Sequence, residues 1–307
     1  MNGKQAKVIA MGGLVLAAGL AASLAGSAGA QDGDSFASLP STITLTGVVR
    51  DFRERSVTGG HPDFQRQPTG GFGHYMQQST DTLDDEGKPL FRSTGNMVAS
   101  AWRDRSGRNI INSKSYISAR SGDVAGRLDA NKTGSLTTAA NFAQWWRDVP
   151  NVNVSRQLNL NLVRQTGTNI YTFNDRTDNT YSGRGGFFPI NGELFGNSAG
   201  DNRNFHFTFE LSTQFDYRRG SGQVFSFTGD DDVLVFIDNK LVIDIGGVHS
   251  AINQAIELDR LNWLQDGQTY SLKFFFVERH RTQSNFRIDT TMQLRSVDPP
   301  TTSNLYD

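Results

Sequence analysis

Strict alternation of apolar and polar side chains over residues 205–211 limits most strongly what this chain can fold into. Because successive side chains of a strand point to opposite faces, Phe205, Phe207, Phe209 and Leu211 are predicted to share one face. Residues 285–294 alternate in the same way. Further strand-like runs lie at 42–52, 158–163, 170–173, 223–228, 233–237, 240–245 and 269–277. Many short strands with turn residues between them predict an all-β sandwich or barrel.

One turn and one helix stand out among these strands. Asp238 and Asn239 separate two apolar runs, and both residue types tolerate a positive φ, so we expect a two-residue hairpin. Aromatic and apolar residues at helical spacing then predict a single short helix that begins near residues 137–141 and ends before Pro150. Its apolar face would consist of Phe142, Trp145, Trp146 and Val149. We expect the two tryptophans to pack the helix onto a sheet, although a sugar-stacking platform is the alternative. The other connections, residues 53–90 above all, are predicted to be long loops in which His61 and His74 are exposed.

The N-terminus has the composition of a secretory signal peptide. Two lysines precede an uncharged apolar run, and small residues up to Ala30 precede polar Gln31. We therefore expect residues 1–30 to be cleaved rather than kept as a membrane anchor, since the run is short and contains Gly and Ser. We further predict a flexible leader over 31–41, one β domain over 42–295 and a disordered tail over 296–307. No other apolar run is long enough to span a bilayer, so we expect a secreted or cell-surface protein that does not insert into membranes.

Charge and cysteine content narrow the function classes. Without residues 1–30 the chain has 28 basic and 31 acidic residues, a formal charge of −3. No basic stripe remains, so nucleic acid is not an expected partner. The chain has no cysteine, which excludes a thiol nucleophile and a cysteine-based zinc site. An exported domain without disulfides must be stabilised by its core or by a bound metal.

The densest chemical signal is the acidic triplet Asp230-Asp231-Asp232, which lies between two strand-like runs. Three adjacent carboxylates repel one another unless something compensates their charge. Ca²⁺ takes six to eight oxygen ligands and suits such a cluster. The alternative is a solvated acidic turn, or carboxylates that accept hydrogen bonds from the backbone.

The segment around this triplet, from Gly229 to His249, resembles the fibro-slime family, a branch of the PA14-like domains. Segments near Leu258–Leu261, Asp266–Tyr270, Phe274–His280 and Ser284–Phe286 extend the similarity, and weaker similarity reaches back to Thr44. The resemblance implies a PA14-like β-sandwich or barrel. In the sugar-binding members, two consecutive aspartates, often joined by a cis peptide, bind calcium that coordinates sugar hydroxyls. It therefore implies that Asp230 and Asp231 are metal ligands. Asp232 occupies a position where the superfamily often has Gly, and it is included as a third candidate.

Other candidate residues come from neighbouring loops. Further metal or sugar contacts are predicted from the asparagines, one tryptophan and one arginine of the C-terminal half, namely Asn253, Asn262, Asn285, Trp263 and Arg279. Trp263 could stack on a sugar or be partly buried, and Arg279 could contact a ligand or pair with Glu278. Three residues are predicted to support the acidic loop from behind, namely His249, Glu278 and His280.

Three function classes remain at this stage. The first is a non-catalytic, calcium-dependent module that binds an extracellular glycan or polysaccharide in recognition or adhesion. The second is a structural domain, rigidified by calcium, whose partner is a matrix or cell-surface protein. The third is a polymer-acting hydrolase, which is disfavoured because no carboxylate pair stands out. A His-based metalloenzyme site built on His206, His249 and His280 is disfavoured too, because their spacing matches no metal motif.

Overall fold

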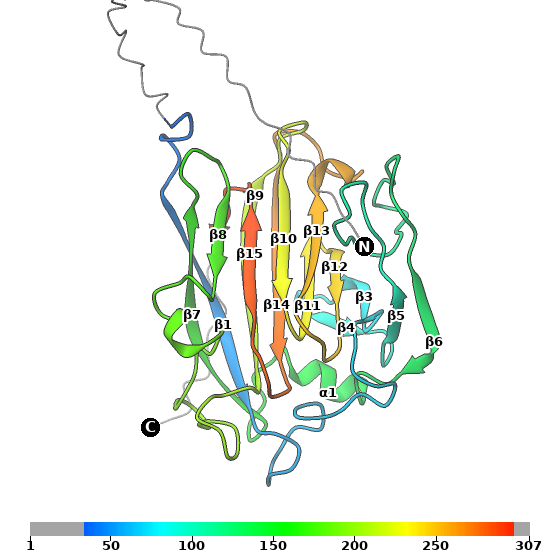
Figure 1. The fold of residues 1–307 in the computed structure, drawn as a ribbon, viewed down its shortest axis with the longest axis vertical. Coiled ribbons are helices and arrows are strands. Elements are labelled where there is room, and N and C mark those ends of the chain that lie inside the picture. Colours follow the sequence, from blue (N-terminus) through cyan, green and yellow to red (C-terminus); the bar gives the residue numbers. More distant parts are fainter. Residues whose placement is uncertain (1–33, 298–307) are drawn as a thin grey trace, which may run out of the picture. The chain divides into compact units, whose positions relative to one another are not determined.

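The structure is a computed structural model that describes residues 34–297, and the predicted signal peptide and most of the predicted tail lie outside that range. Its main feature is one large antiparallel sheet with the order β12-β11-β14-β9-β1-β7-β8-β15-β10-β13 (Figure 1). These strands are β1 (Thr42–Phe52), β7 (Asn153–Arg164), β8 (Tyr171–Asn174), β9 (Phe207–Asp216), β10 (Val224–Gly229), β11 (Asp232–Ile237), β12 (Lys240–Ile245), β13 (Ile252–Glu257), β14 (Thr269–Glu278) and β15 (Phe286–Thr290). A short strand, β16 (Arg295–Ser296), pairs with β9. The predicted all-β fold is confirmed.

Two smaller sheets and little helix complete the fold. The segment between β1 and β7 forms β2 (Tyr75–Met76), β5 (Asn96–Ser100) and β6 (Arg127–Thr133) in one sheet, and β3 (Ser79–Leu83) and β4 (Pro89–Phe91) in another. The helical elements are α1 (Ala139–Gln144) and two 3-10 turns, η1 (Ser182–Arg184) and η2 (Leu258–Arg260). Within residues 34–297, no helix is both long and apolar enough to cross a membrane.

The large sheet folds back so that two of its halves face each other across a core rich in phenylalanine. Phe227 of β10 and Phe274 of β14 lie 5.6 Å apart between ring centroids. Phe286 of β15 and Phe276 of β14 lie 5.0 Å apart. Because β10 and β15 are several strands away from β14 in the sheet order, these contacts can form only between facing layers. The abundant phenylalanines therefore account for the main core.

A second core covers the opposite face of β14. Phe275 and Val277 point there, and the ring of Trp146 lies 5.0 Å from that of Phe275. Trp145 and Trp146 are almost fully buried, so the prediction that they pack a helix onto the sheet is confirmed. Helix α1 is shorter than predicted, since it starts at the cap Thr138 and ends at Gln144. The tryptophans then continue in a turn, where Thr208 of β9 donates a hydrogen bond to the carbonyl of Trp145.

Several other predictions are confirmed or corrected. The hairpin at Asp238 and Asn239 is confirmed, with φ values of 47° and 65°. The prediction that His61 is exposed is wrong, because the residue is buried and its ring packs edge-on against Phe52 and Phe64 at centroid distances of 5.4 and 5.2 Å. His74 is half-buried rather than exposed.

The polar face of the alternating strand around residues 205–211 is covered by other parts of the chain, whereas the alternation predicted that it faces solvent. Thr208 and Glu210 are buried, although their positions in the pattern indicated the solvent side. Glu210 pairs with Arg50 and Lys88, so its buried charge is compensated.

Strand β13 was not predicted at all, since its sequence INQAIE alternates poorly. The part of the predicted leader that the structure describes makes contacts with the sheet, since Asp34 pairs with Arg164 at 2.7 Å.

Candidate functional site

The acidic loop connects β10 to β11, two strands that lie in opposite halves of the folded sheet. The N–H of Asp230 donates to the carbonyl of Asn285 at 3.3 Å, and the N–H of Asp231 donates to that of Val277 at 3.2 Å. The loop is therefore anchored to the segment before β15 on one side and to β14 on the other. The peptide bond between Asp230 and Asp231 is cis, the form that the resemblance led us to expect.

The carboxylate of Asp230 is held in place by Asn285. It accepts hydrogen bonds from the backbone N–H and the side-chain Nδ2 of Asn285, at 2.6 and 2.7 Å. The Oδ1 atom of Asn285 accepts a hydrogen bond from Arg176, so the side-chain amide donates to Asp230 and accepts from Arg176. Burial raises the pKa of Asp230. Asn285 was predicted to contact the metal or a sugar, and in the structure it orients Asp230.

Asp231 and Glu278 form the least compensated part of the site. Asp231 accepts only two long hydrogen bonds, from the N–H groups of His249 at 3.4 Å and Arg279 at 3.3 Å. Glu278 is fully buried and its Oε2 atom has no hydrogen-bond partner. Burial raises the pKa of Asp231 and of Glu278 well above their usual values, and the nearby carboxylates add to this rise. Three buried carboxyl groups thus lie within electrostatic range of one another.

Asp232 has a different environment from the two residues before it. Its carboxylate pairs with the guanidinium of Arg279 and accepts a hydrogen bond from the N–H of Gly247 at 2.7 Å. Arg279 is fully buried, and it also donates to the hydroxyl of Ser135 at 2.7 Å. This arrangement offers no surface of Arg279 to an external ligand, and its ion-pair partner is Asp232 rather than Glu278. The reason is that β11 and β14 are antiparallel neighbours, with Asp232 opposite Val277.

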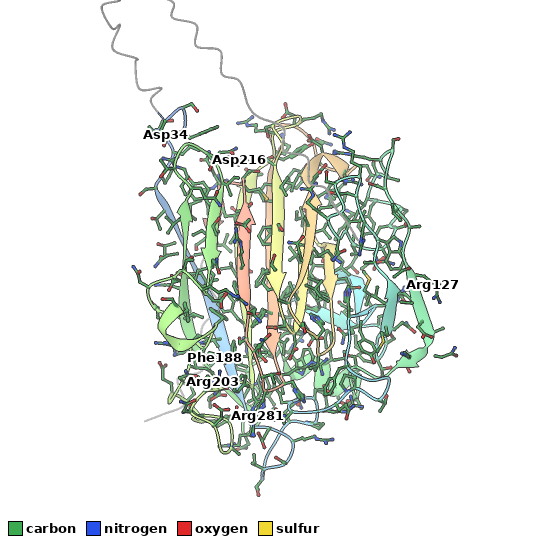
Figure 2. The ribbon with its side chains drawn as sticks, in the orientation of Figure 1. Asp34, Arg127, Phe188, Arg203, Asp216 and Arg281 are labelled. Carbon is green, nitrogen blue, oxygen red and sulfur yellow. The ribbon has the colours of Figure 1, made fainter. Side chains whose placement is uncertain are left out.

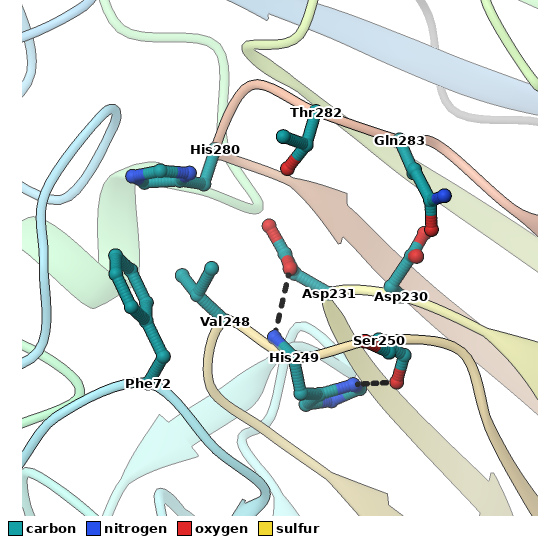
Figure 3. A pocket seen from close by; sticks show the side chains of 9 residues that line it. All are labelled: Phe72, Asp230, Asp231, Val248, His249, Ser250, His280, Thr282 and Gln283. Carbon is teal, nitrogen blue, oxygen red and sulfur yellow. Dashed lines mark hydrogen bonds between the residues drawn. The ribbon is translucent and has the colours of Figure 1, made fainter.

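A pocket of about 290 Å³ opens above Asp230 and Asp231 (Figure 3). Its walls come from three segments distant in sequence, which contribute Val248, His249 and Ser250, then His280, Thr282 and Gln283, and finally Phe72. No sequence pattern selects Phe72, which lies in a glycine-rich stretch, Gly70-Gly71-Phe72-Gly73, that is typical of a turn. Asp230, Asp231, His249 and His280, all predicted at the site, do meet here.

His249 contributes its backbone and a neutral ring. Its Nδ1 atom lies 2.9 Å from the carbonyl oxygen of Ser250, and its ring is edge-on to that of His74 at 5.8 Å. Burial lowers the pKa of His249 to about 4 and that of His74 to about 3. Both rings are therefore uncharged at neutral pH and add no positive charge that would oppose a cation.

Three predicted ligand residues lie elsewhere. Asn253 of β13 lies opposite Thr228, two residues before Asp230, but its side-chain amide donates hydrogen bonds to the hydroxyls of Ser226 and Thr228. Asn262 and Trp263 follow β13, whose far end pairs with Val224 at the other end of β10. Figure 2 shows these two ends, with Arg281 near the acidic loop and Asp216, opposite Thr269 of β14, at the far end. There Trp263 packs against Tyr116 and Lys240, in agreement with the partial burial that was the alternative for it.

The fit of this site to a metal ion can be tested on its oxygens. Within residues 34–297, no three His, Asp or Glu side chains meet in a geometry that could hold a metal by themselves. A cation here would thus need additional oxygens from backbone carbonyls, water or a ligand. The carboxylates supply oxygens with an excess of negative charge, and Glu278 Oε2 has no partner. The rings of His249 and His280 also line the pocket, and Nε2 of His249 has no partner either. The oxygens by themselves fit a hard cation such as Ca²⁺, whereas a site that used the two rings would suit a softer metal.

Comparison with known proteins gives relatives that match about half of this chain. The chain is 34% identical to protein psiR of Dictyostelium discoideum over 168 residues, which are 53% of this chain and 16% of psiR. It is 38% identical to protein psiD of the same organism over 158 residues, 49% of this chain and 29% of psiD. The chain therefore spans less than a third of either relative.

Similarity to solved structures is low. An anti-sigma factor domain-containing protein aligns with 31% of this chain and 34% of its own length, at 19% identity and a TM-score of 0.24, a value too low to support an argument.

A protein-family match covers only part of the chain. Residues 188–304, which contain the acidic loop and every wall of the pocket except Phe72, match the PA14 domain.

Proposed function

We propose that this protein is a non-catalytic, extracellular module that binds a carbohydrate through a calcium ion held by Asp230 and Asp231. The observation that carries the proposal is a group of three buried carboxyls, of which Asp230 and Asp231 line an open pocket and Glu278 lies buried behind them. Uncompensated carboxylates are costly when they are buried, and a bound cation would remove that cost. The PA14 match over the same residues supports a carbohydrate-binding or adhesion role.

Each residue of the site has a separate task in this proposal. Asp230 and Asp231 face the pocket and bind the ion, which supplies open coordination positions for sugar hydroxyls. Asn285 fixes the carboxylate of Asp230, and the pair of Asp232 with Arg279 fixes the start of β11. Glu278 adds negative charge from behind the loop. In the proposal Asp232 is thus a positioning residue, which leaves two aspartates of the triplet as ligands.

Calcium binding is tested by isothermal titration of Ca²⁺ into chelator-treated protein lacking residues 1–30. The wild type is expected to bind one ion with saturation, and the Asp230→Ala/Asp231→Ala double variant is expected to lose that binding. Asp85→Asn is the matched control, because it removes one exposed carboxylate elsewhere. Equal binding by wild type and double variant would place the ion elsewhere and would overturn the proposed site.

Carbohydrate binding is tested by glycan-array binding and by retention on immobilised polysaccharides, in Ca²⁺ and in EDTA. We expect the protein to be retained on an immobilised polysaccharide in Ca²⁺ and to be released by EDTA or by free sugar. If the protein binds calcium but is retained on no glycan, the structural alternative is favoured, in which the ion rigidifies the loop and the partner is a protein. Release of reducing sugar from a retained polymer would contradict a non-catalytic role.

A further inference from the structure

Phe72 is an exposed aromatic side chain at the edge of the pocket. Its side chain is 51% exposed, and it is the only aromatic among the large exposed hydrophobic residues of the described chain. Every other phenylalanine in residues 34–297 is buried or half-buried, so exposure is unusual for this residue type here. A half-exposed phenylalanine ring forgoes part of the free energy that its burial would contribute, which suggests a use for the exposed ring.

The backbone around Phe72 is fixed on both sides. The N–H of Gly73 donates to the carbonyl of Val248 at 2.8 Å, and the hydroxyl of Tyr75 donates to the carbonyl of Gly71 at 2.8 Å. Gly71 has a φ of +98°, which a residue with a side chain adopts only with strain. The ring itself contacts that of His280 edge-on at a centroid distance of 5.0 Å. Phe72 is therefore held in one position while its ring remains open to solvent.

The pocket has one polar and one apolar side. Asp230 and Asp231 lie at its base, and in Figure 3 Phe72 and His280 lie to one side of Asp231. A pyranose ring has the same division, because its hydroxyls point outward while carbon-bound hydrogens form apolar patches on its faces. Aromatic rings bind such apolar faces by contact while polar groups bind the hydroxyls.

We propose that Phe72 stacks on the apolar face of a single terminal sugar residue whose hydroxyls point to Asp230 and Asp231. This inference rests on the proposed function and adds that Phe72 forms the side of the pocket that determines which sugar binds. The volume of about 290 Å³ lies just below the range of roughly 300–1,000 Å³ for small-molecule sites, which favours one sugar unit over an extended chain. Phe72 lies outside the residues that match the PA14 domain, in the segment between β1 and β7.

The experiment uses calcium-loaded protein and a panel of four methyl glycosides, of mannose, glucose, galactose and fucose, measured by titration and by saturation-transfer NMR. For the sugar that binds best, Phe72→Ala is expected to weaken binding about tenfold, and Phe72→Tyr to stay within about twofold, because the ring is kept. Leu90→Ala removes another exposed apolar side chain outside the pocket and is expected to change nothing. Calcium affinity should be equal in all four proteins.

The outcomes separate this inference from the function on which it rests. Wild-type sugar affinity in Phe72→Ala, together with loss of sugar binding in the Asp230→Ala/Asp231→Ala variant, would overturn the stacking and leave the proposed function standing. Failure of the wild type to bind any glycoside or glycan would overturn both. Loss of calcium affinity in Phe72→Ala would assign Phe72 a role in folding the loop, and the stacking would again be wrong.

Discussion

Arg279 is a single buried cation beside three carboxyl groups, and its guanidinium pairs with Asp232 alone. Removing one partner of a buried ion pair leaves the other charge buried without compensation, at a cost of about 3–5 kcal/mol. We expect Arg279→Met to lower the free energy of unfolding by that amount, measured by urea unfolding. Arg295→Met is the control, since its pair with Asp216 is half exposed on both sides and should cost less than about 1 kcal/mol. A loss in Arg279→Met no larger than in the control would show that the pair is not structurally important.

Asp51 gives a prediction on pH at the same scale. It is buried in β1, where it accepts hydrogen bonds from Asn204 and from the N–H of Phe195, both at 2.8 Å. Burial raises the pKa of Asp51 to about 7 in the folded protein, whereas aspartate in an unfolded chain titrates near about 3.9. Between these values the folded state binds more protons, so the stability contributed by Asp51 is full below about pH 4 and is lost as the pH rises to about 7.

The Asp51→Asn variant removes this titration. The wild-type-minus-variant difference in unfolding free energy should therefore fall by on the order of 4 kcal/mol from about pH 4 to about pH 7, and stay constant above that. Urea unfolding at a series of pH values measures it. A difference that is constant across the whole range would contradict a raised pKa at Asp51.

Single residues were predicted from the sequence where a short pattern determines them. The triplet Asp230-Asp231-Asp232 could be selected because three adjacent carboxylates need compensation, and the resemblance then selected Asp230 and Asp231 within it. The environment of Asp232 could not, because its partner Arg279 is 47 residues away and depends on strand pairing. Phe72 could not either, because exposure of one phenylalanine among 21 depends on what the fold leaves uncovered.

At the scale of elements, the β11–β12 hairpin shows how local chemistry determines structure. Asp238 is exposed and has a φ of 47°, a conformation that costs β-branched residues most. We expect Asp238→Val to lower the free energy of unfolding by about 1–2 kcal/mol. Asp238→Gly is the matched control and should be neutral or slightly stabilising, because glycine adopts this φ without strain. Thermal unfolding of both variants tests this, and equal melting temperatures would be inconsistent with a turn of this type.

Elements with a clear period were predicted well, and those built by their surroundings were not. The first strand and β12 have the predicted bounds, because apolar patterning and turn residues mark both ends. Strand β13 was missed because its burial depends on its neighbours in the fold, since it pairs with β10 and Gln254 accepts a hydrogen bond from the N–H of Asp244 in β12. Helix α1 was predicted too long, since Trp145 and Trp146 are positioned by packing against β14 and not by continued helical hydrogen bonds.

At the scale of the whole molecule, the two hydrophobic cores share their strands. Side chains of β14 alternate between them, so Phe274 and Phe276 belong to the phenylalanine-rich core while Phe275 and Val277 belong to the one beneath α1. Separation of the cores would require β14 to lose half of its contacts, so neither core is an independent unit. The sequence predicted one domain here because no linker divides the chain, but it did not predict two cores, which require knowledge of both faces of β14.

The shared strands predict one cooperative unfolding transition. Three of the four tryptophans pack in or against the core beneath α1, so tryptophan fluorescence reports that core, while far-UV circular dichroism reports the sheet. The two signals should give the same urea midpoint, as expected for a two-state transition. Trp146→Ala should lower both midpoints together, by about 3–5 kcal/mol in unfolding free energy, because the cavity it leaves lies against β14. A fluorescence midpoint that falls well below the circular dichroism midpoint would mean that the segment between β1 and β7 unfolds separately, and the wall that carries Phe72 would then be a detachable addition to the sheet.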